Sequence, residues 1–144
     1  MGGYLVKQVN LYIKNQHKGP GKTTRKGIYI LEFITAKEPV TLTGYLTTEN
    51  CTKNKADTLI LIKALKHLKM PVLLAIYANN PYILAILEKM KKHQETWTNQ
   101  KGEPISNMEE WKEVDNLLKP HTYHTVKDTH SYANWMDEQL KNES

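Results

Sequence analysis

Cysteine is almost absent from this chain, and this limits its chemistry. Its 144 residues include a single cysteine, Cys51, which has no partner for an internal disulfide. With only one cysteine beside its six histidines, the chain offers no Cys/His zinc framework. Proteins that use no disulfides suit a reducing compartment, so we expect a cytoplasmic location.

Long apolar stretches are also missing. No uninterrupted apolar run approaches the length of a membrane span, and the first residues lack the pattern of a secretory leader. We therefore expect no membrane partner. With 40% hydrophobic and 24% charged residues, and with no linker or internal repeat, the sequence predicts one globular domain over residues 1–144.

Acidic residues are scarce in the first two thirds of the chain. Residues 1–101 contain 16 basic and 6 acidic side chains, whereas residues 102–144 contain 4 and 9. Such a separation creates a positive face that attracts polyanions such as nucleic acid. The alternative is a solvated lysine-rich surface, as an AT-rich bacterial or phage genome would encode.

The periodicity of apolar residues predicts an α/β layered sheet. Alternation over residues 9–13, 28–34 and 40–46 predicts three antiparallel strands, with a Gly, Pro, Lys and Thr-rich turn over residues 14–26. Helical spacing predicts helices over residues 54–68, 82–92, 108–118 and 131–140. Residues 72–77 and 122–126 are predicted as strands between them. This order fits a mixed sheet but does not by itself choose one fold.

Four segments resemble those that bring active-site carboxylates together in ribonucleases H: residues 10–14, 52–57, 75–79 and 126–137. A further pattern, W-x6-P-x2-N-x3-W from Trp97 to Trp111, resembles the segment that follows the basic protrusion of the bacterial enzymes. We expect its tryptophans to pack rather than to catalyse. The resemblance covers nearly the whole chain and implies a ribonuclease H-like fold, with a five-stranded mixed sheet and helices on both faces.

The acidic pattern of that family is only half present. Asp57 and Asp137 stand at two of the four positions, but Lys14 and Asn79 stand at the other two. Two-metal hydrolysis needs several carboxylates to hold both ions. We therefore expect no cofactor and predict that Lys14 replaces an ion by pairing with Asp57 and Asp137. If the chain is active with Mg²⁺ or Mn²⁺, Asp57 and Asp137 are the metal candidates.

The resemblance also implies residues for catalysis and for binding. His130 resembles the mobile-loop histidine of the family, and Asn54 resembles an asparagine that contacts the duplex minor groove, where a short amide donates and accepts. Capping the first helix is the alternative role for Asn54. Asn15 and Asn80 are expected to line the same groove. Lys91 and Lys92 resemble the basic protrusion, or else are cations at a helix C-terminus. Phosphate contacts are expected from Lys18, Lys22, Arg25, Lys26, Lys53 and Lys55.

The sequence thus predicts a ribonuclease H-like protein that binds an RNA:DNA hybrid or another duplex without cleaving it, of mobile-element or phage origin. Two alternatives remain open. One is an active ribonuclease H that recruits other acids, such as Glu49 or Asp128. The other is a protein-interaction module on the same fold.

Overall fold

A five-stranded mixed sheet forms the centre of the computed structural model, which describes residues 7–93, 95–127 and 130–141. The strand order is β3-β2-β1-β4-β5. β1 pairs antiparallel with β2 and β2 with β3, whereas β4 lies parallel to β1 and β5 parallel to β4. The strands are β1 (Lys7–Asn15), β2 (Thr23–Phe33), β3 (Val40–Cys51), β4 (Val72–Tyr77) and β5 (Thr122–Val126).

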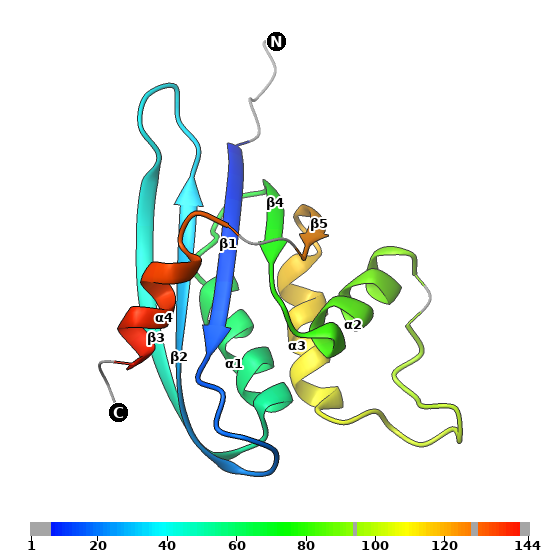
Figure 1. Ribbon diagram of the computed structural model, residues 1–144. Coiled ribbons are helices and arrows are strands. Elements are labelled where there is room, and N and C mark those ends of the chain that lie inside the picture. Colours follow the sequence, from blue (N-terminus) through cyan, green and yellow to red (C-terminus); the bar gives the residue numbers. More distant parts are fainter. Residues whose placement is uncertain (1–6, 94, 128–129, 142–144) are drawn as a thin grey trace.

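Helices cover both faces of this sheet, as the resemblance implied (Figure 1). The main core joins one face of the sheet to α1 (Lys53–Leu65), α2 (Pro81–Lys91) and α3 (Met108–Leu118). On the other face, α4 (Ala133–Lys141) packs Met136 and Leu140 against Tyr12, Ile28 and Ile30. No helix among the described residues is long and apolar enough to cross a membrane.

The predicted elements are confirmed, and their differences lie at the ends. β4, α3 and β5 have the predicted bounds, but β2 begins at Thr23 and β3 continues to Cys51. These extensions are polar, so apolar alternation does not mark them, and pairing with the neighbouring strand defines them. α1 ends at Leu65, and its N-terminal cap is Thr52, whose Oγ accepts from the Lys55 amide at 3.2 Å. The capping role considered for Asn54 was therefore wrong.

Trp111, the last residue of the W-x6-P-x2-N-x3-W pattern, lies beside the start of α2, and Trp97 packs against the main core. Trp111 is fully buried, and its indole nitrogen donates to Tyr82 Oη at 2.9 Å. Asn107 Nδ2 donates to the same hydroxyl, which in turn donates to the Ser106 carbonyl. The pattern thus fastens the loop before α3 to α2, which confirms the packing role predicted for Trp111.

Candidate functional site

The four family positions converge at one end of the central strands. β1 and β4 are parallel neighbours, so Lys14 and Asn79 emerge at the same edge of the sheet. A cavity of about 160 Å³ is lined by Lys14, Asn79, Asp57 at the start of α1, and Asn80. A smaller space of about 30 Å³ joins Lys14 and Asn79 to His130. The tertiary structure therefore brings the predicted residues to one place.

Asp57 is buried and fully hydrogen-bonded by three donors. Its Oδ1 accepts from Asn15 Nδ2 at 2.7 Å. Its Oδ2 accepts from Asn80 Nδ2 and from Lys53 Nζ, both at 2.8 Å. Lys53 precedes Asp57 by one helical turn, so its ammonium folds back along α1 to the carboxylate. The carboxylate joins β1, α1 and the start of α2.

The hydrogen bonds around Asn80 decide which way two amides face. Asn80 Oδ1 accepts from the backbone amide of Tyr82, as an N-cap does, so its Nδ2 must face Asp57 and Asn54. Asn80 Nδ2 donates to Asn54 Oδ1 at 2.9 Å, which turns the NH₂ group of the exposed Asn54 amide away from Asn80 and leaves it available to a ligand. The expectation that Asn54 contacts a minor groove stays a prediction.

Lys14 pairs with Asp137, which confirms one of the two contacts predicted for it. Both side chains are partly exposed, at 32% and 46%. The second predicted contact, to Asp57, is replaced by Lys53. Each carboxylate that the family pattern keeps therefore has its own ammonium partner.

This donor set does not fit a divalent ion. Among the residues that the structure describes, no three His, Cys, Asp or Glu side chains lie close enough together to hold a metal. Asp57 already accepts from three donors, and the Lys14 ammonium occupies Asp137. Glu49 is exposed on β3 and lines neither of the two spaces, and Asp128 lies outside the described residues.

His130 lies against the sheet rather than in open solvent. Its ring centroid is 4.4 Å from that of Tyr12 and 5.7 Å from that of Tyr77. Burial lowers the pKa of His130, and the charge of Lys14 lowers it further. Its Nδ1 accepts from the Tyr132 amide at 3.2 Å, so the neutral ring carries its proton on Nε2. His130 thus reaches the edge of the site as a neutral ring.

A second buried acid, Glu32, supports this aromatic group and was not singled out in the sequence. Glu32 Oε1 accepts from Asn10 Nδ2 and Tyr12 Oη, both at 2.9 Å, and Oε2 accepts from Tyr132 Oη at 2.7 Å. Burial alone would raise the pKa of Glu32, but these hydrogen bonds outweigh it and the pKa is lowered. An acid within the apolar run of β2 was the available sequence signal.

Two of the residues expected to contact nucleic acid are buried. Asn15 is 3% exposed, and its amide is committed to Asp57. Arg25 is fully buried, where its guanidinium donates to the carbonyls of Gln16, Gly19 and Gly21. Both expectations are corrected because these polar groups are needed inside the fold.

The other predicted cations lie in the β1–β2 loop, on β2, on the first turn of α1 and at the far end of α2. Lys18 and Lys22 are exposed in the β1–β2 loop, and Lys53 and Lys55 are partly exposed on the first turn of α1. Lys26 is partly buried, with its ammonium 4.7 Å from the centre of the Tyr45 ring. Lys91 and Lys92 are exposed at the far end of α2, about 16 Å from Asn80 at 1.5 Å per residue.

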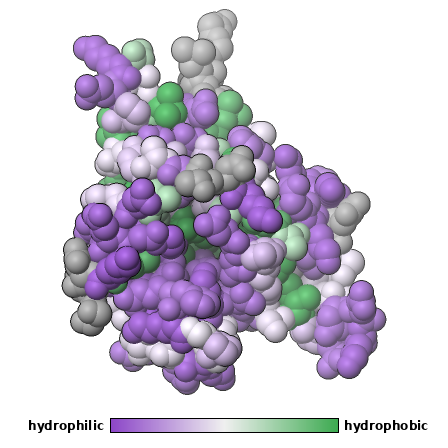
Figure 2. Space-filling view, viewed as in Figure 1, coloured by the Kyte–Doolittle hydropathy of each residue, from purple (hydrophilic) through white to green (hydrophobic). Residues whose placement is uncertain are grey.

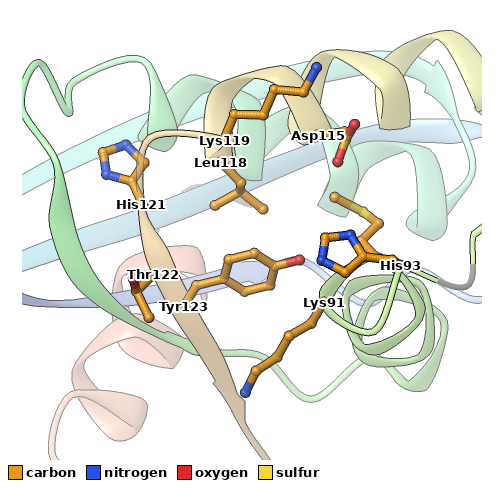
Figure 3. A pocket seen from close by; sticks show the side chains of 9 residues that line it. Lys91, His93, Asp115, Leu118, Lys119, His121, Thr122 and Tyr123 are labelled. Atoms are coloured by element: carbon orange, nitrogen blue, oxygen red, sulfur yellow. The ribbon is translucent and has the colours of Figure 1, made fainter.

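A larger cavity, of about 420 Å³, lies at that far end and is separate from the family positions. It is bounded by the ends of α2 and α3 and by the start of β5 (Figure 3). His93, Asp115 and Tyr123 point toward one another there, whereas the Lys91 and Lys119 ammonium groups point away. Burial raises the pKa of Tyr123 to about 12, with the charge of Asp115 adding to the effect. None of its lining residues belongs to the four-acid pattern.

Comparisons with known proteins give the same fold and a sequence similarity to ribonucleases H. No protein-family model matches the chain. A ribonuclease H from Clostridium botulinum is 28% identical over 129 residues, which cover 85% of this chain and 83% of that protein. A solved type 1 ribonuclease H with the type 2 active-site motif, LC9-RNase H1, superposes with a TM-score of 0.74 at 15% identity, over 98% of this chain and 74% of that one. The chain therefore has a ribonuclease H-like fold and is similar in sequence to ribonucleases H.

Further ribonucleases H match the chain in part or at lower similarity. The ribonuclease H of Caldanaerobacter subterraneus is 30% identical over 84 residues, so the chain spans about half of that relative's length, 54%, with 55% of its own. LC11-RNase H1 in complex with an RNA/DNA hybrid superposes with a TM-score of 0.62 at 11% identity, over 93% of this chain and 94% of that one. This level of identity shows the fold alone.

Proposed function

We propose that this chain binds an RNA:DNA hybrid or a related duplex without a metal ion and does not cleave it. One observation carries the proposal: each carboxylate that would hold an ion already has a lysine, Lys53 on Asp57 and Lys14 on Asp137. A divalent ion would have to displace both ammonium groups and several amide donors. Hard cations need oxygen ligands free to turn toward them.

The same two lysines suit a role in binding phosphate. Lys14 stands at a position where the family pattern has a carboxylate, Lys53 lies one helical turn before Asp57, and both side chains are about one third exposed. Neutralising phosphates is the sequence-independent part of duplex affinity. The Asn54 NH₂ group, fixed as a donor, suits the acceptor atoms of a shallow minor groove. The family likeness to a protein solved with an RNA/DNA hybrid supports this choice of ligand.

Binding and cleavage should be measured on one sample. We expect no cleavage of a hybrid in Mg²⁺ or Mn²⁺, and binding that is unchanged by a chelator. Lys53→Ala should reduce the slope of log affinity against log salt by about one unit, because one phosphate contact is lost. Lys69→Ala is the matched control, since Lys69 is exposed beyond the opposite end of α1. Binding that requires a metal would contradict the proposal.

Restoring the family pattern should restore metal affinity. In the triple variant Lys14→Asp, Asn79→Asp and Asp57→Glu, four carboxylates replace the present pair of ion pairs. Calorimetric titration with Mn²⁺ should release or absorb heat with this variant and not with the parent. Cleavage needs finer ligand placement and is a weaker expectation. Tight Mn²⁺ binding by the parent would show that Lys14 and Asn79 do not lie at the metal positions.

An active ribonuclease H is the second candidate. The observation in its favour is the name of the curated relatives, together with a solved type 1 ribonuclease H that carries another type's active-site motif. Metal-dependent cleavage by the parent chain, abolished by Asp57→Asn, would establish it. If the chain neither cleaves nor binds a duplex at low salt, a role in protein interaction takes the place of both.

A further inference from the structure

A second hollow, of about 510 Å³, lies beside the candidate site, where the β1–β2 loop meets the end of α4. We call it the α4 hollow; its lining includes Gln16, His17, Lys18, Asp137, Leu140 and Lys141. Lys14, Asn15 and His17 line both this hollow and the 160 Å³ cavity. A chain of phosphates that passes through the candidate site could therefore continue into the α4 hollow without leaving the surface.

The loop that forms one wall is held in place from two sides. Gln16 Nε2 donates to the Leu140 carbonyl at 2.8 Å, and Gln16 Oε1 accepts from the Lys26 amide at 3.0 Å. Beneath the loop, the buried Arg25 guanidinium donates to three loop carbonyls. These hydrogen bonds hold the loop backbone, which presents the exposed His17 and Lys18 side chains.

The charge of the hollow favours an anion. Asp137 is the one acid among its described lining residues, and Lys14 already pairs with it. Lys18 and Lys141 then remain as two exposed ammonium groups, from segments 123 residues apart. Figure 2 shows mostly hydrophilic residues on the surface around and below the end of β1. Tertiary structure thus places one of the few lysines of the acidic C-terminal part beside the basic loop.

We propose that the α4 hollow binds a backbone phosphate of the same nucleic acid that occupies the candidate site, through Lys18 and Lys141. This inference rests on the proposed function and extends its footprint toward α4. The ligand is a phosphodiester, because the described lining offers two exposed lysines, contains no Phe, Tyr or Trp, and has His17 as its one ring. Binding at the hollow is therefore independent of base sequence.

The double variant Lys18→Ala/Lys141→Ala tests the inference. For a long RNA:DNA hybrid, the slope of log affinity against log salt should fall by about two units relative to the parent. Combining it with Lys53→Ala should remove about one unit more, because the contacts lie at separate sites. Lys69→Ala/Lys112→Ala is a control with the same charge change on exposed residues outside the hollow. An unchanged slope in the Lys18/Lys141 variant would overturn the inference.

A second measurement separates this inference from the proposed function. Inorganic phosphate is titrated into the labelled parent protein while the backbone amide resonances of residues 16–18 and 141 are followed. We expect saturable shifts at these amides, and none in the double variant. If the shifts appear but the parent binds no duplex, the proposed function is refuted and the anion site is retained. If the parent binds duplex, but phosphate causes no saturable shift and the salt slope of the double variant is unchanged, the anion site is refuted and the proposed function stands.

Discussion

Two buried carboxylates, Asp57 and Glu32, are satisfied in different ways on the two faces of the sheet. Asp57 accepts from two amides and from the Lys53 ammonium, and it lines a cavity. Glu32 accepts from one amide and two tyrosine hydroxyls, and its partners link β1, β2 and the segment just before α4. One acid has a cation beside it, and the other has only neutral donors.

The difference distinguishes a place where a ligand fits from a place that holds the fold together. A carboxylate held by neutral donors keeps its charge only because those donors are fixed, so it acts as a structural anchor. A carboxylate paired with a partly exposed lysine leaves that lysine able to meet an incoming anion as well. Three predictions sharpen or break this comparison.

The largest effect on stability should come from Asp57→Ala. The variant leaves Asn15, Asn80 and Lys53 without their acceptor, and we expect a loss of about 3 kcal/mol, because one partner of a buried pair is removed. Asp137→Ala is the matched comparison, since its partly exposed pair with Lys14 should be worth less than about 1 kcal/mol. Urea denaturation measures both. Equal losses would mean that Asp57 is not the central acceptor.

Glu32→Gln should cost about 2 kcal/mol at neutral pH, because three hydrogen bonds lose a charged acceptor. The pKa of Glu32 is lowered below its usual 4.5, so the unfolded chain takes up the proton first as the pH falls. The contribution of Glu32 is then complete above pH 4.5 and is lost as the pH falls through the folded-state pKa. The free-energy difference between parent and variant should therefore shrink below pH 4.5.

The unfolding free energy of the parent and of the Gln variant, compared across pH by urea denaturation, checks this prediction. Glu138→Gln on the exposed side of α4 is the control and should leave the pH profile unchanged. A difference between parent and Glu32→Gln that stays constant down to acid pH would show that the charge of Glu32 is not what the tyrosines stabilise.

The smallest effect is expected from Gly27→Ala in β2. Gly27 lies opposite Asn15, and a methyl group there would collide with the buried Asn15 Oδ1. Asn15 must then move away from Asp57, and we expect a loss of about 1 kcal/mol. The double variant Gly27→Ala/Asn15→Ala removes the collision, so a double-mutant cycle should show coupling between the two positions. If the stability losses of the two single variants simply add up in the double variant, the loss in Gly27→Ala does not come from its collision with Asn15.

The order of the elements could be read from the sequence because each has its own period and length. The apolar run of β4 and the spacing of α3 needed no tertiary information, and the segments with Lys14, Asp57, Asn79 and Asp137 were enough to choose the fold. Polar ends, such as those of β2 and β3, could not be read this way, since a neighbouring strand rather than composition defines them.

The sequence by itself predicted the ribonuclease H-like scaffold and, through the resemblance, the replacement of two of the four acids. Only the tertiary structure decided the partners of the remaining groups: Lys53 rather than Lys14 on Asp57, a buried Arg25 beneath the β1–β2 loop, and Asn80 as the donor to Asn54. The spacing of apolar residues is a local property of the chain, so it predicts individual helices and strands. Pairing depends on which side chains meet in space, from 4 residues apart for Lys53 and Asp57 to 124 residues apart for Gln16 and Leu140, and for a buried charge the nearest available partner takes the contact.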